Sequence, residues 1–239
     1  MTVRIAHLSD IHFGGENVAA VEAAVDAVAA FNPSLTVVSG DVTLNGLPRE
    51  FEAAAAWLAR LPAARIVTPG NHDTPYWNLV LRALTPFARY RRWIGRANVA
   101  VFEAPGLVAR SLNSARGAQP RPDWSKGAIA IDELAAFDWG DPDGDALKVF
   151  ACHHPLIDVQ GAPVTGGVHR GGKAAAILAK AGVDLVLSGH VHNPFVFQLP
   201  NAVAGRYAIG AGTLSLRTRG TPAGFSTIEA DDKAKDPLQ

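Results

Sequence analysis

The sequence is poor in cysteine and carries no excess of charge. Cys152 is the single cysteine among 239 residues, so an intramolecular disulfide is excluded. Basic and acidic residues number 22 each and the pI is near 7.1, so no overall positive field favours a nucleic acid duplex as partner. Hydrophobic residues make up 48% and charged residues 18%. This balance is typical of a globular α/β domain with one substantial core.

Long apolar runs are also missing. No stretch approaches the roughly 20 residues needed to cross a bilayer. The first fifteen residues contain Asp10 and two histidines in place of an uninterrupted apolar stretch, so we expect no signal peptide and a cytoplasmic location. Because no linker or repeat divides the chain, residues 1–230 are predicted to form one domain. Residues 231–239 are polar and are predicted to form a flexible tail.

Short apolar runs rich in β-branched residues alternate with segments of helical periodicity. Strands are predicted at residues 3–8, 35–39, 65–68, 108–112, 147–152 and 183–187. Helices are predicted at 18–31, 48–60, 128–137 and 171–181, and closing antiparallel strands within 194–228. The β-α-β-α-β order of the first half predicts an α/β fold with parallel strand pairing.

Five polar blocks recur, each directly after a predicted strand. They are Asp10-Ile11-His12, Gly40-Asp41, Gly70-Asn71-His72-Asp73, His153-His154-Pro155 and Gly189-His190-Val191-His192. The carboxyl ends of parallel strands meet at one edge of a sheet, so these blocks are predicted to meet in one crevice. Together they supply carboxylates, an amide and imidazoles, which is the ligand set of a two-metal hydrolytic site.

Each block alone has an ordinary structural interpretation. An isolated Asp-x-His or Gly-Asp is common in surface turns, and adjacent histidines before a proline are compatible with a hydrogen-bonded core. The occurrence of all five blocks, each after an apolar strand, favours the metal site. Two further side chains are interpreted as structural: His7 as a packed histidine within the first strand, and Cys152 as a small core residue rather than a nucleophile.

In this order the blocks resemble the pattern of the calcineurin-like metallophosphoesterase superfamily. That pattern runs Asp-x-His, Gly-Asp, Gly-Asn-His-Asp or Glu, His, and Gly-His-x-His, and here it spans residues 10–192. The chain is most similar to the small bacterial class III cyclic-nucleotide phosphodiesterases within it. The supporting residues are Leu8-Ser9-Asp10-Ile11-His12-Phe13, Gly40-Asp41-Val42-Thr43 and the helix that ends at 137. The resemblance implies a four-layer α-β-β-α sandwich with mixed sheets.

The resemblance also implies a role for each motif residue. One metal ion would be held by Asp10, His12 and His192. The other would be held by Asn71, His153 and His190, with Asp41 bridging both. His154 would support a ligand without binding metal. His72 would stand beside the substrate as the proton donor, and Asp73 would orient its ring.

The implied reaction is hydrolysis of a small phosphodiester by a hydroxide that bridges the two metals, with 3′,5′-cyclic nucleotides as candidate substrates. The ligand types suit divalent or trivalent manganese, iron, zinc or cobalt, and do not choose among them. Two alternatives stay open within enzymes: a phosphomonoesterase and a nucleotide-lipid pyrophosphatase. From another class, the chain could be a noncatalytic scaffold with the same fold, although His72 and all seven ligands are present.

The segment 76–101 carries five arginines and no acidic residue, with aromatic and aliphatic residues interleaved. One interpretation is an amphipathic helix or helical pair with a solvated basic face. The other is a cap beside the site that receives phosphate-bearing or lipid-like substrates. Solvent, a peripheral membrane contact and a second copy in a homodimer are the three environments that the sequence leaves open for this segment.

Overall fold

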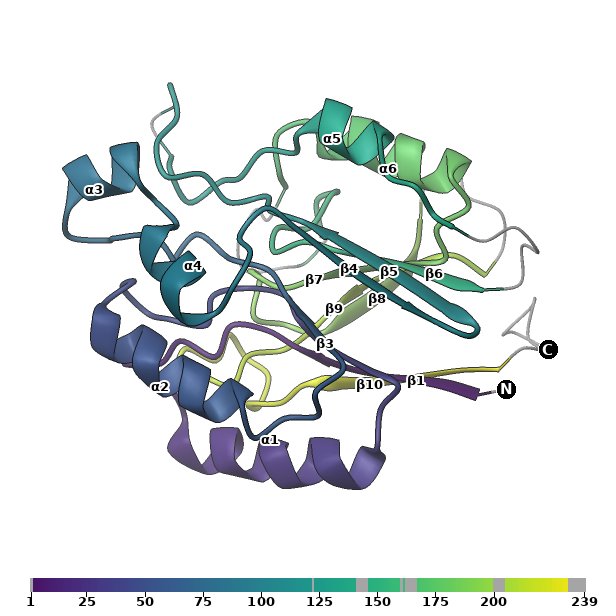
Figure 1. Cartoon of the computed structure of the whole chain (residues 1–239), viewed down its shortest axis with the longest axis horizontal. Coiled ribbons are helices and arrows are strands. Elements are labelled where there is room, and N and C mark those ends of the chain that lie inside the picture. Colours follow the sequence, from purple (N-terminus) through teal and green to yellow (C-terminus); the bar gives the residue numbers. More distant parts are fainter. Residues whose placement is uncertain are drawn as a thin grey trace.

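Two β-sheets lie face to face, and helices cover both outer faces (Figure 1). The computed structural model describes residues 2–121, 123–140, 146–159, 161, 167–199 and 205–231. The first sheet has the strand order β10-β1-β2-β3. Its strands are β1 (Thr2–Leu8), β2 (Leu35–Val38), β3 (Arg65–Val67) and β10 (Ser226–Asp231). The parallel pairing predicted for the first three strands is confirmed, and β10 closes the sheet antiparallel to β1.

The second sheet has the order β4-β5-β6-β7-β9-β8. Its strands are β4 (Val99–Ala104), β5 (Leu107–Leu112), β6 (Leu147–Ala151), β7 (Leu185–Ser188), β8 (Phe195–Gln198) and β9 (Tyr207–Gly210). The three pairs from β5 through β6 and β7 to β9 are parallel, whereas β4 and β8 join the edges antiparallel. Both sheets are therefore mixed.

Helices complete four layers. The first sheet is covered by α1 (Val18–Phe31) and α2 (Pro48–Leu58), and the second by α5 (Ile131–Ala135) and α6 (Gly171–Lys180) (Figure 1). Two short helices, α3 (Leu79–Leu84) and α4 (Ala88–Trp93), lie at the end of the molecule towards which β1 runs. The predicted α-β-β-α sandwich is confirmed.

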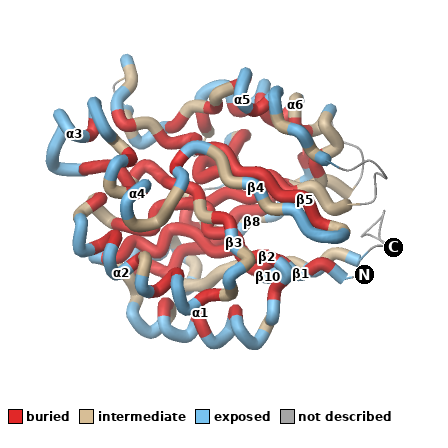
Figure 2. Tube along the Cα trace, viewed as in Figure 1, coloured by how far each residue is buried: buried red, intermediate tan, exposed pale blue. Residues whose placement is uncertain are grey.

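Three hydrophobic clusters fill the spaces between these layers. Along β1 alternate side chains point to opposite faces, as the strand period of two requires. Val3 and Ile5 join the cluster between the two sheets, while Leu8 joins the cluster under α1 and α2. A third cluster lies between the second sheet and α5 and α6. Figure 2 shows most of the central strands as buried and the outer helices as partly exposed.

The structure corrects three predicted elements. The helix expected from residue 128 begins only at Ile131, because the backbone of residues 128 and 129 pairs with Ser114 and His169 instead. Residues 99–101, expected within the helical segment, open the edge strand β4. The closing strands are not all antiparallel, since β9 pairs with β7 in parallel. Residue 231 ends β10, and the rest of the predicted tail lies outside the described residues.

Candidate dinuclear metal centre

The five polar blocks follow β1, β2, β3, β6 and β7 and converge at one end of the sandwich. Ligand atoms of Asp10, His12 and His192 lie within 4.8 Å of one another. The same limit holds for Asp10, Asp41 and His153. Asn71 Oδ1 lies 3.2 Å from His153 Nε2, which adds the amide to the second group. His190 belongs to a further group of this kind, with His153 and His154. The side chains predicted as ligands therefore form overlapping groups that share Asp10 and His153.

The backbone of this centre is held in an unusual conformation. Five of the residues predicted as ligands have φ between 51° and 70°, in the left-handed region: Asp10, His12, Asp41, His190 and His192. Such a conformation costs a residue with a side chain on the order of 1 kcal/mol, and it clusters at functional sites. Backbone hydrogen bonds hold it in place, since Asp10 N–H donates to Gly40 O and His12 N–H to Asp41 O, both at 3.0 Å. These bonds link the loops after β1 and β2.

Glycines in two blocks allow the backbone to come close to the carboxylates. A Cβ at Gly70 would overlap Oδ1 of Asp41, and a Cβ at Gly189 would overlap Ser9 and Asp10. Glycine is therefore required before Asn71 and before His190, because a side chain there would collide with the neighbouring carboxylate.

Backbone carbonyls orient the imidazoles. Nδ1 of His153 lies 2.8 Å from Ser39 O, and Nδ1 of His192 lies 2.7 Å from Arg217 O. Nδ1 of His12 makes a longer contact of 3.3 Å with Thr43 O. Because a carbonyl only accepts, each Nδ1 carries a proton, and each Nε2 faces the centre, where the neutral ring offers its lone pair.

The two carboxylates offer oxygens to the same space. Oδ2 of Asp10 accepts hydrogen bonds from Ser9 Oγ at 2.6 Å and His190 N–H at 2.8 Å. Its Oδ1 is buried without a hydrogen-bond partner among the described residues, and it lies 3.1 Å from Nε2 of His192. A buried orphan oxygen that faces imidazole lone pairs fits a bound cation.

Asp41 lies between the two groups. Its Oδ1 accepts from His72 N–H at 2.8 Å. Its Oδ2 is 3.2 Å from Nε2 of His153 and 3.9 Å from Nε2 of His12. One carboxylate oxygen therefore faces an imidazole of each group, which is the position that a bridging ligand needs.

Charge interactions keep both carboxylates ionised. Burial acts to raise the pKa of Asp10 and of Asp41, but the surrounding imidazoles outweigh it and hold both pKa values below their usual range. Burial likewise acts to lower the pKa of His153, and Asp41 outweighs it to raise that pKa to about 9. The pKa of His190 falls to about 3, through burial and the neighbouring His153. Ionised carboxylates and a neutral imidazole are the forms that coordinate metal.

His154 is arranged differently from its neighbour. Its Nδ1 lies 2.8 Å from Ser114 Oγ, and its Nε2 lies 2.8 Å from Ser125 O. Ser114 Oγ also accepts from His154 N–H at 3.1 Å, so this hydroxyl is left to donate to Nδ1. Both ring nitrogens of His154 are therefore engaged by protein groups, whereas Nε2 of His153 points into the centre. This arrangement supports the choice of His153 as the ligand, which stays a prediction.

The structure changes the role expected for Asp73. The His72 ring is held by Leu44 O, 2.7 Å from Nδ1, and Asp73 makes no hydrogen bond to this ring within the described residues. Asp73 instead accepts from Thr43 N–H and Thr43 Oγ1, both at 2.9 Å, and from Gly70 N–H at 2.9 Å. Burial, aided by Asp41, raises its pKa to about 6. The expectation that Asp73 orients the ring was wrong, because its oxygens tie the loops after β2 and β3 together.

Several residues of the centre were not found from the sequence. Ser9 anchors Asp10, and its position beside the first block was a usable signal. Arg217 and Arg219 lie on the loop after β9, where Arg217 O holds His192 and Arg219 Nη1 lies 3.5 Å from His190 O. No motif or spacing pointed to these arginines, because only the fold brings their loop to the site.

Comparison with known proteins agrees with this geometry. The family model described as calcineurin-like phosphoesterase matches residues 3–194. The chain belongs to this family, and buried histidine and aspartate clusters mark its candidate two-metal site.

A probable cyclic nucleotide phosphodiesterase from Synechococcus sp. is 27% identical over 207 residues, which is 82% of this chain and 76% of that protein. The glycerophosphodiester phosphodiesterase GpdQ of Enterobacter lignolyticus is 34% identical over 80 residues, 29% of each chain. The crystal structure of a dimetal phosphatase from Danio rerio shares the fold, with a TM-score of 0.64 and 14% identity over 94% of this chain and 91% of that one. Within the described residues, no helix is long and apolar enough to cross a membrane.

Proposed function

We propose that this protein is a dinuclear metal-dependent phosphodiesterase. The observation that carries the proposal is the place of Asp41, whose carboxylate faces imidazoles of both clusters. Asp10, His12 and His192 would hold one ion, and Asn71, His153 and His190 the other. The two phosphodiesterase relatives support a diester as the substrate, and 3′,5′-cyclic nucleotides are the first class to test.

When bound, the two cations would supply Lewis acidity towards the phosphate and activate water at neutral pH. The protein's own residues would orient the substrate and supply the proton for the leaving group. Asp41 and Asp10 bring only two negative charges, so the loaded centre keeps a positive charge that attracts an anionic diester.

The proposal assigns protonation of the leaving oxygen to His72. Its Nδ1–H donates to Leu44 O, so Nε2 is left to carry the second proton. Burial lowers the pKa of His72, and the nearby charge of Asp41 partly offsets this. An anionic substrate beside the ring would favour the imidazolium further, which ties proton donation to substrate binding.

The test joins metal analysis to a substrate panel. Purified protein supplied with manganese is analysed by plasma mass spectrometry and assayed with bis(p-nitrophenyl) phosphate, p-nitrophenyl phosphate, cyclic nucleotides and glycerophosphodiesters. We expect about two metal ions per chain and faster hydrolysis of diesters than of monoesters. Metal binding without hydrolysis of any ester would favour the noncatalytic scaffold. Preference for the monoester would replace the proposal with a phosphomonoesterase.

A further inference from the structure

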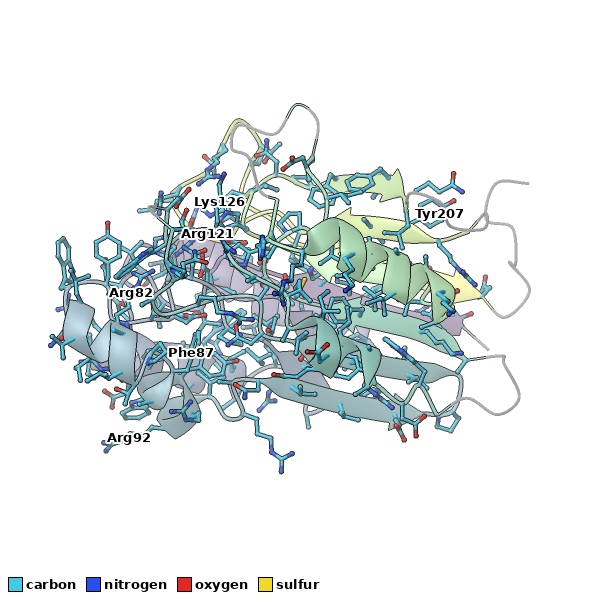
Figure 3. The ribbon with its side chains drawn as sticks, turned by 90° about the horizontal axis from the view of Figure 1, so that it is seen from above. Arg82, Phe87, Arg92, Arg121, Lys126 and Tyr207 are labelled. Atoms are coloured by element: carbon cyan, nitrogen blue, oxygen red, sulfur yellow. The ribbon has the colours of Figure 1, made fainter. Side chains whose placement is uncertain are left out.

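Helix α3 buries its charged side chain and exposes its apolar ones, which is the reverse of an ordinary surface helix. Its only charged residue, Arg82, is 7% exposed, whereas Leu79, Val80 and Leu84 are 60%, 66% and 76% exposed. Figure 2 shows the helix as largely exposed at the edge of the molecule, and Figure 3 shows Arg82 on the side of α3 that faces the body. A helix that only covers a core places its apolar residues inward. The inversion therefore needs another explanation.

Polar contacts fix this orientation of the helix. Arg82 Nε donates to Gly117 O at 2.9 Å, Nη2 lies 3.4 Å from Trp124 O, and the guanidinium lies 5.8 Å from the centre of the Trp124 ring. Turning the leucines inward would break all three of these contacts, so the contacts of Arg82 favour the observed orientation. The apolar face of α3 thus stays outward in the folded protein.

The outward face belongs to a concentrated apolar patch. Among the described residues, ten large hydrophobic side chains are exposed, and six of them fall within residues 76–84. They are Tyr76, Trp77, Leu79, Val80, Leu81 and Leu84. Single exposed apolar residues are normal, but a contiguous group of this kind marks an interaction surface.

Exposed positive charge follows the patch along the chain, where the guanidinium of Arg92 lies 5.6 Å from the centre of the Trp93 ring. Arg91 and Arg92 on α4, and Arg96 after it, are exposed, and none makes an ion pair with a described residue. Arg92 is directed away from the body in Figure 3. Residues 74–102 contain no aspartate or glutamate. A partner for this surface must combine an apolar layer with negative charge.

We propose that residues 76–96 dock onto the surface of a lipid bilayer that contains anionic lipids. Trp77 and the α3 side chains would enter the headgroup boundary, and the α4 arginines would contact lipid phosphates. A second copy of the chain fits less well, because the same surface on a twofold partner would offer these arginines no carboxylate. The rings of Tyr76 and His72 are stacked, with centroids 6.3 Å apart, so the docking surface borders the candidate active site.

Vesicle co-sedimentation of the full-length protein tests this proposal without any catalytic step. Vesicles of phosphatidylcholine alone are compared with vesicles that also contain phosphatidylglycerol. We expect binding to the anionic vesicles, weakened by added salt because charges at the surface are then screened. The double variant Val80→Ser, Leu84→Ser should bind about tenfold more weakly. Arg91→Gln with Arg92→Gln should weaken binding to the anionic vesicles selectively.

Matched controls come from the same chain. Val196 on β8 is 66% exposed, as Val80 is, so Val196→Ser should leave vesicle binding unchanged. Lys173→Gln on α6 removes an exposed positive charge away from residues 76–96 and should also leave vesicle binding unchanged. Thermal melting checks that each variant is folded. The proposal is overturned if the wild-type protein does not co-sediment with anionic vesicles, or if Val196→Ser reduces binding as much as the α3 double variant. A dimer in sedimentation velocity that Leu84→Ser dissociates would assign the surface to self-association instead.

Discussion

Nε2 of His153 lies 3.2 Å from Oδ2 of Asp41. This contact joins the loop after β6 of the second sheet to the loop after β2 of the first. Because this carboxylate also faces His12, its removal affects both predicted metal positions at once. We expect Asp41→Ala to lose most bound metal and at least about 100-fold in diester hydrolysis. Metal stoichiometry by plasma mass spectrometry and turnover of bis(p-nitrophenyl) phosphate check this. Asp26→Ala, an exposed carboxylate on α1, serves as the control and should change neither quantity.

His72 is expected to matter for proton transfer and not for metal affinity. His72→Ala should keep the metal content of the wild type. Turnover should fall about 100-fold for a diester with an alkoxide leaving group and much less for one with nitrophenolate, which departs without a proton. Comparing kcat for the two esters measures the difference. If His72→Ala cleaves the alkyl ester as fast as wild type, His72 is not the acid.

Asp73 is expected to act on stability, because its oxygens accept from the backbones of both Thr43 and Gly70. Asp73→Ala leaves these buried donors unpaired and should cost about 3 kcal/mol, a drop in Tm of roughly 5 to 10 °C. Thermal unfolding of the metal-free protein measures this effect. An unchanged Tm combined with a reduced kcat would restore the ring-orienting role that the sequence suggested.

Gly70 is expected to be intolerant of a side chain. In Gly70→Ala the new methyl group would overlap Oδ1 and the backbone nitrogen of Asp41, so the bridging carboxylate must move. We expect reduced metal content by mass spectrometry. Gly172 on α6 has open space around it, and Gly172→Ala should keep the metal and be at least as stable, since alanine favours helix. Equal metal loss in both variants would contradict the close-approach argument.

His7 should make stability depend on pH. It is fully buried in β1, with Nε2 2.9 Å from Ser39 Oγ and Nδ1 without a hydrogen-bond partner among the described residues, and burial lowers its pKa to about 3. The interpretation of His7 as a packed histidine fits its full burial, although only one of its ring nitrogens is hydrogen-bonded within the described residues. The unfolded chain binds a proton near pH 6.5, whereas the folded chain does not until about pH 3.

The free energy of unfolding is therefore highest above the unfolded pKa of His7, near 6.5, and decreases as the pH falls towards the folded pKa of about 3. Between about pH 7 and pH 5 the wild type should lose about 2 kcal/mol more than His7→Gln. Urea unfolding at the two pH values measures this difference. If the variant does not fold, an NMR titration of the wild-type imidazole replaces the comparison, and protonation near pH 6.5 in the folded protein would refute the prediction.

Much of the fold could be predicted because its signals are local. The short apolar run at residues 3–8 and the helical period in 18–31 correspond to β1 and α1. The blocks that follow successive strands were expected to meet in one crevice, and Asp10, Asp41 and His153 do meet, but His153 comes from the second sheet and the other two from the first. Strand β4 was not expected, because residues 99–101 continue the apolar and basic character of the helices before them. Only their pairing with β5 makes them a strand.

The sequence by itself determined the ligand chemistry and the alternation of strands and helices along the first half of the chain, because side-chain type and periodicity are properties of the local chain. Tertiary structure alone decided which backbone carbonyls hold the imidazoles, such as Leu44 O for His72 and Arg217 O for His192. It also decided that α3 turns Arg82 inward and its leucines outward, against the ordinary helical pattern. The physical reason is the same in both cases: these contacts join segments that lie far apart along the chain and meet only after folding.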